Sequence, residues 1–173
     1  MPFISIIIPN YNHAPYLTER IESVLNQTYQ DFEVIILDDC STDNSKEIIE
    51  EYRNHAKISH IIFNEQNSGS TFKQWNKGVS MAKGEWIWIA ESDDYAAENF
   101  FFFSLKVIEQ DASLGMVFTN SNAVNNEGEF LTTTAESKNV SYTQLATYQN
   151  RIDKENISLF LVSEMIVENA SCV

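Results

Sequence analysis

The chain has 173 residues, of which 43% are hydrophobic and 21% are charged, and this is the composition of a globular domain with a sizeable core. It carries 25 acidic residues against 11 basic ones, for a net charge of −14, and has no basic run. This balance argues against a nucleic-acid partner and against adhesion to anionic lipid. It suits an enzyme that binds an anionic ligand through a divalent cation. An equally good explanation is that the negative charge only keeps the protein soluble.

The cysteines and the N-terminal segment indicate the cellular compartment in which the protein is found. Cys40 and Cys172 lie far apart and show no metal-ligand spacing, so we expect free thiols in a reducing environment. The first apolar run is too short for a secretory signal or a membrane span, and no basic residue precedes it. We therefore expect a cytoplasmic protein without a transmembrane segment. It would reach the inner face of a membrane only through other regions or partners.

Four short runs of apolar and β-branched residues predict strands that are buried on both faces. They cover residues 3–8, 33–37, 58–63 and 86–90. Three amphipathic helices are expected between them. The first begins near Pro15, the second is N-capped by Asp43, and the third ends before Gly84. Four apolar residues mark the third helix, namely Phe72, Trp75, Val79 and Ala82.

The pattern changes after residue 90. We expect a helix over about 97–109, a strand at 116–118, a turn at 125–128 between extended segments, and short helices at 142–148 and 154–162. The four repeats of strand, polar loop and helix imply right-handed βαβ crossovers. The fold class is therefore predicted to be α/β, with a mostly parallel, Rossmann-like sheet flanked by helices and antiparallel additions in the C-terminal third. Residues 1–173 are expected to form one domain.

Acidic side chains follow two of the predicted strands, where ligands of open α/β sheets bind. Asp93 and Asp94 come just after the fourth strand. Mg²⁺ and Mn²⁺ prefer oxygen ligands, and Mg²⁺ is often held by one or two carboxylates together with phosphates of the substrate. The pair therefore suits a cation that bridges a diphosphate. The alternative is that both residues cap the following helix.

Other polar residues near the strand ends are candidates for binding a nucleotide. Asp38 and Asp39 would accept hydrogen bonds from a nucleobase imide or a ribose hydroxyl, or would only hold their own loop through bonds to its backbone. Tyr11 would stack on a base, or pack beside the loop. Lys73 would approach a phosphate, or remain a solvated helix residue. It lies near a turn that contains Asn67 and Gly69.

Taken together, these segments resemble glycosyltransferase family 2, whose catalytic domain has the GT-A fold. The resemblance is carried by residues 5–12 (SIIIPNYN), 23–29 (SVLNQTY), 32–43 (FEVIILDDCSTD), 76–78 (NKG) and 82–87 (AKGEWI). It covers roughly residues 3 to 120. The order and spacing of several motifs make it more specific than any one of them.

The resemblance implies a nucleotide pocket lined by Pro9, Tyr11, Asn12 and Asp39, in which Asp39 contacts a uracil-like base edge and Asp38 lies beside it. It also implies a divalent cation, Mn²⁺ or Mg²⁺, at the acidic pair. Asp94 is then the first choice as direct ligand, and Asp93 serves both the cation and the nucleotide. The family moves a sugar from a nucleoside-diphosphate sugar, here UDP-linked, to an acceptor hydroxyl, usually with inversion. The acceptor, a saccharide or a lipid-linked molecule, and the oligomeric state are not predicted.

The sequence departs from the family pattern at three points. Glu91 stands where many members have Asp, and Trp75 stands where many have Arg. The general base is expected beyond Val173, so residues from about 121 onward would form an incomplete acceptor side, after a nucleotide-sugar part of about 1–120. The chain would then be a truncated transferase, or a binding module that holds a nucleotide sugar without turnover. A dinucleotide-dependent oxidoreductase is set aside, because the loop after the first strand has no glycine.

Overall fold

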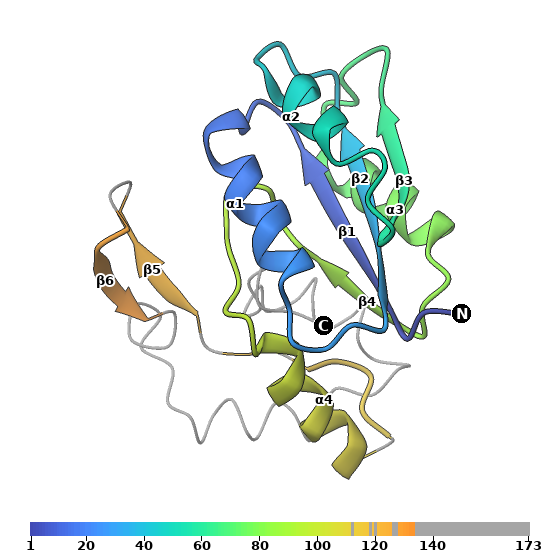
Figure 1. Cartoon of the computed structure of the whole chain (residues 1–173), viewed down its shortest axis with the longest axis vertical. Coiled ribbons are helices and arrows are strands. Elements are labelled where there is room, and N and C mark those ends of the chain that lie inside the picture. The colour runs from blue at the N-terminus through green and yellow to red at the C-terminus, as the bar shows by residue number, and fades with distance from the viewer. Residues whose placement is uncertain (112, 118, 120, 126–127, 134–173) are drawn as a thin grey trace. The chain divides into compact units, whose positions relative to one another are not determined.

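A sheet of parallel strands forms the centre of the computed structural model, which describes residues 1–111, 113–117, 119, 121–125 and 128–133 (Figure 1). The strands are β1 (Ile4–Asn10), β2 (Phe32–Asp38), β3 (Ile58–Phe63) and β4 (Trp86–Ile89), in the order β3-β2-β1-β4. All three pairings are parallel. Every residue of β1 and β2 is buried, as their continuous apolar runs predict. The predicted strands and the mostly parallel sheet are therefore confirmed.

Helices cover both faces of this sheet. They are α1 (Ala14–Leu25), α2 (Ser45–Glu51) and α3 (Thr71–Met81). In Figure 1, α1 and α2 lie in front of the sheet and α3 lies behind it. Right-handed crossovers require this arrangement, because the chain moves outward from β1 to β3 and then returns across the sheet to β4.

The face of the sheet that α3 covers is packed unusually closely. Ile7, Ile35 and Leu37 form a buried cluster there, with Met81 and Ala82 among the side chains packed against it. The approach of α3 depends on two glycines. A Cβ on Gly78 would lie 2.4 Å from Ile7 Cγ2, and one on Gly84 would lie 2.5 Å from the backbone nitrogen of Ser5.

The third helix is confirmed, but the apolar residues that mark it do not all face inward. Phe72 and Val79 are exposed, at 66% and 45%, whereas Gln74 and Gly78 are buried. The close contact between Gly78 and the sheet turns this face inward. The hydrophobic residues that flank it are left at the surface.

The start of α2 also differs from its prediction. Asn44, not Asp43, occupies the N-cap, and its side chain makes no capping bond. Asp43 instead accepts hydrogen bonds from Ser45 N–H and from Ala14 N–H, each at 3.0 Å. Burial raises the pKa of Asp43, but hydrogen bonds lower it by a larger amount. The pKa of Asp43 therefore lies below the ordinary value. Asp43 therefore links the first turns of α2 and α1.

The chain divides into two compact units, Met1–Phe103 and Ser104–Val173, and the expectation of a single domain stays a prediction. Helix α4 (Phe100–Gln110) crosses the boundary, and β5 (Asn122–Val124) pairs with β6 (Phe130–Thr133) in antiparallel fashion. The expected turn is confirmed, since Gly128 N–H donates to Asn125 O at 2.9 Å. The antiparallel addition is confirmed as well.

The remaining predictions for the later part of the chain are shifted, wrong, or concern residues that the structure does not describe. The helix expected from about residue 97 begins at Phe100. The strand expected at 116–118 is wrong for Met116 and Val117, which belong to no strand; Val117 is buried, so its apolar character reflects burial and not strand pairing. Phe118 and the helices expected at 142–148 and 154–162 lie outside the described residues.

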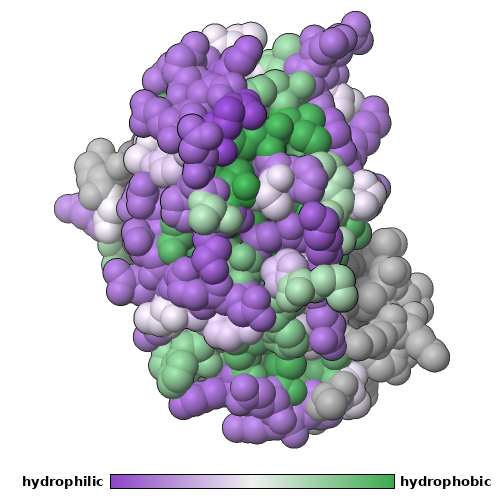
Figure 2. All heavy atoms as spheres, turned by 45° about the vertical axis from the view of Figure 1, so that its right-hand side comes forward, coloured by the Kyte–Doolittle hydropathy of each residue, from purple (hydrophilic) through white to green (hydrophobic). Residues whose placement is uncertain are grey.

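One face of the molecule is shown by residue hydropathy in Figure 2. The face shown in Figure 2 is mainly hydrophilic, and its apolar side chains gather in small patches. Among the helices that the structure describes, none has the length and apolar character needed to cross a bilayer.

Candidate functional site

The polar loops after the strands meet at the carboxyl edge of the sheet, where the chain reverses direction across it. β1 lies between β2 and β4, and ligands of open α/β sheets bind beyond such a switch point. Helix α3 contacts two of the loops. Gln74 Nε2 donates to Asp39 Oδ1 at 2.8 Å, and the neighbouring Trp75 Nε1 donates to Glu91 Oε1 at 2.8 Å. Adjacent residues of one helix thus bring the acidic loops after β2 and β4 together.

Asp38 ties the loop after β2 to the end of β1. Its buried carboxylate accepts from Asn10 Nδ2 at 2.8 Å, from Ser41 Oγ at 2.5 Å and from Ser41 N–H at 2.9 Å. Asn12, in the left-handed region at φ 57°, accepts from Thr42 N–H at 2.7 Å and donates its own N–H to Ser41 Oγ at 2.9 Å. These bonds to the loop are the ones that the alternative interpretation of Asp38 predicts.

Asp39 is buried, and its carboxylate is fixed by donors from the segment after β3 and from α3. Oδ1 accepts from Asn64 Nδ2 at 2.6 Å, from Ser68 N–H at 2.9 Å and from Gln74 Nε2 at 2.8 Å. Oδ2 accepts from Ser68 Oγ at 2.7 Å. A carboxylate with this many donors is held in one orientation.

The turn after β3 packs against the same loop. Asn67 Nδ2 donates to the carbonyl of Asp39 at 3.0 Å, and Asn67 Oδ1 accepts from Gly69 N–H at 2.7 Å. Gly69 has a φ of 69°, which favours glycine. Lys73 Nζ donates to Ser68 O at 2.8 Å. The structure therefore brings Asn67, Gly69 and Lys73 together beside Asp39.

Pro9 and Tyr11 lie at and beyond the end of β1. Ile7 O accepts from Ala90 N–H at 2.8 Å, so alternate residues of β1 direct their backbone groups toward β4. Pro9 therefore faces the side on which β4 has already ended at Ile89, and its missing N–H breaks no ladder bond. Tyr11 is 46% exposed. Its ring is available at the carboxyl edge.

The loop after β4 presents the predicted acidic pair. Asp93 and Asp94 are exposed, while Glu91 is half-buried and Ser92 is buried. Asp94 N–H donates to Glu91 O at 3.3 Å and closes a turn. Because α4 begins only at Phe100, the alternative that the pair caps the following helix is wrong.

One face of α1 holds this loop and the segment that follows it. Arg20 Nε donates to the carbonyl of Glu91 at 2.7 Å. Ser23, further along the same helix, and Gln27, just after its end, bond the backbone of residues 96–101 at distances of 2.7 to 3.2 Å. Helix α1 therefore sets the position of the acidic loop relative to the sheet.

The acidic loop contains two groups with shifted pKa values. Burial, together with the charges of Asp93 and Asp94, raises the pKa of Glu91 to about 7, although the bond from Trp75 and the charge of Arg20 lower it. Burial lowers the pKa of Arg20 to about 10, against the attraction of the neighbouring carboxylates, foremost Asp94. Arg20 is therefore still charged at neutral pH.

The residues present fit half of a divalent cation site. The described part of the chain has no group of three or more His, Cys, Asp or Glu side chains able to hold a metal ion. Asp93 and Asp94 nevertheless offer exposed carboxylates on one turn. Since Mg²⁺ is often bound by one or two carboxylates together with phosphates of the substrate, this pair suits an ion that arrives with a diphosphate.

Three residues of the site were missed by the sequence predictions. Arg20 and Gln74 are buried polar residues inside helix faces that pack on the sheet, and a polar residue within an apolar face was the available signal. His13 Nδ1 lies 2.8 Å from Ser92 Oγ and so connects the loop after β1 to the acidic loop. The sequence carries no signal for this contact, because the two partners are far apart along the chain.

Comparison with known proteins identifies the family. The model of a family described as glycosyl transferase family 2 matches residues 5–162. The chain belongs to this family. Together with the parallel sheet, the superposition on family members confirms the α/β GT-A fold.

Individual relatives match a part of their own length. The glycosyltransferase GlyG of Streptococcus pneumoniae is 43% identical over 99 residues, which are 56% of this chain and 32% of that protein. The chondroitin synthase of Escherichia coli is 35% identical over 132 residues, 76% of this chain and 19% of that protein. The crystal structure of Staphylococcus aureus TarS 1-349 in complex with UDP superposes with a TM-score of 0.66 at 32% identity, covering 73% of this chain and 37% of that one. The chain thus spans about a third of GlyG and about a fifth of the chondroitin synthase.

Proposed function

We propose that the chain is the nucleotide-sugar-binding part of a glycosyltransferase that moves a sugar from a UDP-sugar to an acceptor hydroxyl, with inversion at the anomeric carbon. The observation that carries this proposal is the convergence of Asp39 and the Asp93–Asp94 pair at one edge of the sheet, joined through Gln74 and Trp75 of α3. TarS, which is 32% identical over the superposed part, has been crystallised with UDP and with UDP-GlcNAc. This relationship supports UDP as the nucleotide.

On the nucleotide side, we propose that Asp39 receives the imide N–H of the base. Its Oδ2 already accepts from the Ser68 hydroxyl, so the base would share that acceptor or replace the hydroxyl. The exposed ring of Tyr11 would stack on the base. Asp38 and Asn12 support this pocket by holding the loops after β1 and β2 together, and Pro9 shapes its floor.

On the phosphate side, we propose that Asp93 and Asp94 hold Mn²⁺ or Mg²⁺, with Asp93 also near the nucleotide. The bound ion supplies positive charge that stabilises the departing diphosphate. Lys73 lies beside the Asn67–Gly69 turn, with its ammonium bonded to a carbonyl of that turn, and from there it would approach a phosphate. The described residues present no side chain to which we assign the role of general base.

Thermal melting with UDP and Mn²⁺ tests the proposal. A ligand that binds only the native state must stabilise it, by about 2.7 kcal/mol when its concentration is 100 times its Kd. We expect UDP with Mn²⁺ to raise the melting temperature, and Asp93→Ala and Asp94→Ala to abolish the metal-dependent part of that rise. Glu98→Ala is the matched control, because it removes one exposed carboxylate from the same loop.

Two results would contradict the proposal. An unchanged melting curve at millimolar UDP and Mn²⁺ would show that the chain has no binding site for the sugar donor. Equal metal-dependent shifts of the melting temperature in the wild type and in both aspartate variants would show that the acidic pair does not bind the cation. A turnover assay with UDP-sugars, comparing this chain with a longer protein that contains it, separates a transferase from a module that binds a nucleotide sugar without turnover.

A further inference from the structure

Arg20 is a buried cation whose charge has no role in the site described so far. Its side chain is 0% exposed, and its guanidinium carbon lies 5.3 Å from the centroid of the Trp88 ring. Nε donates to Glu91 O at 2.7 Å. Nη2 lies 3.9 Å from Asp94 Oδ2, and within the described chain neither Nη1 nor Nη2 makes a hydrogen bond. Two donor groups of a buried cation thus lie beneath the acidic loop without a hydrogen-bond partner.

A cation in this position is costly by itself. Burying a guanidinium without a negative partner is unfavourable, and the stacking on Trp88 offsets only a part of that cost. The acidic loop has the opposite difficulty. Glu91, Asp93 and Asp94 lie within four residues, and carboxylates this close repel one another unless a positive charge compensates them. The two costs compensate each other across the Arg20–Asp94 contact.

Arg20 is placed to act on the loop and not on a ligand. Because none of its side chain is exposed, a phosphate cannot reach the guanidinium in this arrangement. The bond to Glu91 O fixes the start of the loop, and the charge attracts the carboxylates that follow it. Arg20 is therefore a positioning residue.

We propose that Arg20 is the internal counter-charge of the acidic loop, and that it holds residues 91–94 in place while no cation is bound. The inference rests on the proposed cation site. Without Arg20 the acidic loop would lose this positive charge, and a divalent cation would take over its role. The loss of Arg20 should then weaken the fold when no metal is present and strengthen the binding of the cation.

The chain provides a control for the purely structural part of this role. Gln27 lies just after the end of α1 and holds the segment that follows the acidic loop through Ala97 O and Phe101 N–H, but it carries no charge. A Gln27→Ala variant therefore loses support for the segment without changing the charge next to Asp94. Arg20→Lys keeps the charge and loses the fixed fork of donors.

The experiment measures the melting temperature in chelator and the affinity for Mn²⁺ alone by electron paramagnetic resonance. We expect Arg20→Met to melt lower than the wild type in chelator and to bind Mn²⁺ about tenfold more tightly, since a unit positive charge near the ion is removed. Arg20→Lys should melt lower but keep the wild-type affinity for Mn²⁺. Gln27→Ala should behave in the same way. Equal Mn²⁺ affinity in the wild type and Arg20→Met, or an equal gain in Gln27→Ala, would overturn the proposal.

A second measurement covers the case in which Arg20→Met does not fold or Mn²⁺ binds to none of the proteins. In chelator, Asp94→Asn removes the nearest negative partner of Arg20 and also relieves repulsion within the loop. If Arg20 is the counter-charge, Asp94→Asn melts lower than the control Glu98→Gln. If it melts higher, repulsion dominates and the counter-charge role is wrong. A failure of every variant and of the wild type to bind Mn²⁺ would instead remove the proposed cation site, and this chelator comparison would still decide the role of Arg20.

Discussion

Trp75 and Glu91, the two residues at which the described chain departs from the family pattern, are bonded to each other, with Trp75 Nε1 donating to Glu91 Oε1 at 2.8 Å. The departures are therefore one feature and not two. A neutral indole donor stands where many members have a cationic side chain, and the longer side chain of Glu91 spans the distance to it. The bond joins α3 to the loop that carries Asp93 and Asp94.

A double-mutant cycle tests whether the two positions depend on each other. Trp75→Phe keeps an aromatic ring and removes the N–H, and we expect it to cost about 1–2 kcal/mol of unfolding free energy, because the acceptor is a carboxyl oxygen that is only half-buried. Glu91→Asp shortens the side chain by one methylene and should cost a similar amount. The double variant should lose clearly less than the sum of the two. Urea unfolding measures all four proteins, and additive losses would show that the bond contributes nothing.

Gln74 should affect the base and not the phosphates. It donates to Asp39 Oδ1, so Gln74→Met removes one of the donors that orient this carboxylate while keeping the volume of the side chain. We expect the affinity for UDP to fall by about fivefold, which corresponds to roughly one hydrogen bond, and the affinity for pyrophosphate to remain unchanged. Isothermal titration measures both. The control is Gln66→Met, at an exposed position of the segment between β3 and α3. Equal losses of affinity for UDP and for pyrophosphate would show that Gln74 does not act on the binding of the base.

The sequence predicted the strands within one or two residues, because β1 and β2 are continuous apolar runs that end in polar loops. It also predicted that the acidic clusters share one edge, since parallel strands place their carboxyl ends together. It could not predict which face of α3 turns inward, because that depends on the contact of Gly78 with Ile7 across the sheet. The bond from Arg20 to Glu91 was equally inaccessible, because it joins residues 71 positions apart.

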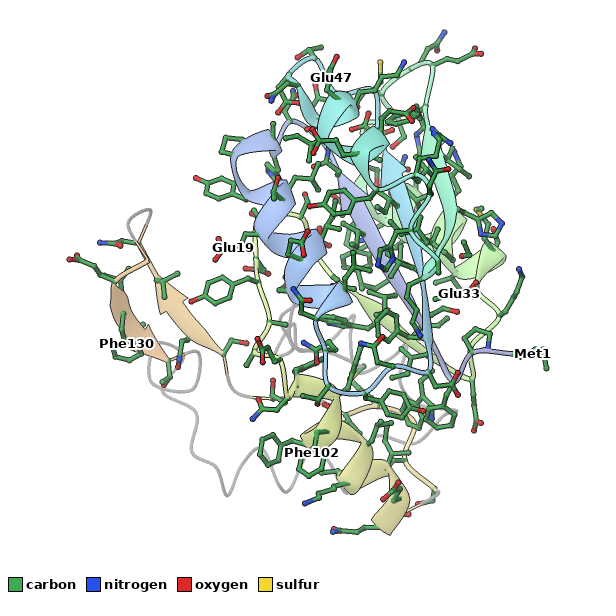
Figure 3. The ribbon with its side chains drawn as sticks, viewed as in Figure 1. Met1, Glu19, Glu33, Glu47, Phe102 and Phe130 are labelled. Carbon is green, nitrogen blue, oxygen red and sulfur yellow. The ribbon has the colours of Figure 1, made fainter. Side chains whose placement is uncertain are left out.

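Glu33 should make stability depend on pH at the opposite end of the sheet from the site. Figure 3 labels this residue on β2, where it is buried and accepts hydrogen bonds from Ser5 Oγ at 2.7 Å and Lys83 N–H at 2.8 Å. Burial raises the pKa of Glu33, but the hydrogen bonds lower it by a larger amount. The pKa of Glu33 therefore lies below the ordinary value of 4.5. A carboxyl group with a depressed pKa stabilises the fold above its unfolded pKa, and this contribution is lost as the pH falls through the folded value.

The matching variant is Glu33→Gln, which keeps an acceptor oxygen and cannot ionise. We expect the wild type to be more stable than this variant at pH 7, and the difference to shrink as the pH falls below about 4.5, where Glu33 itself becomes protonated. Urea unfolding at a series of pH values from 7 to 3 measures the difference. A difference that stays constant over this range would show that the charge of Glu33 does not contribute to stability.

The three glycines around α3 should differ in their tolerance of alanine, for three different reasons. A Cβ on Gly84 would lie 2.5 Å from the backbone of Ser5, which cannot move aside, so Gly84→Ala should cost about 1–3 kcal/mol or more. A Cβ on Gly78 would meet only atoms of the buried Ile7 side chain, which yields more readily than backbone, and Gly78→Ala should cost less. Gly69 has open space around it but a φ of 69°, so Gly69→Ala should cost about 1–2 kcal/mol from backbone strain alone. Urea unfolding of the three variants gives the order, and a Gly78→Ala loss larger than that of Gly84→Ala would mean that the side chain of Ile7 is held as firmly as the backbone.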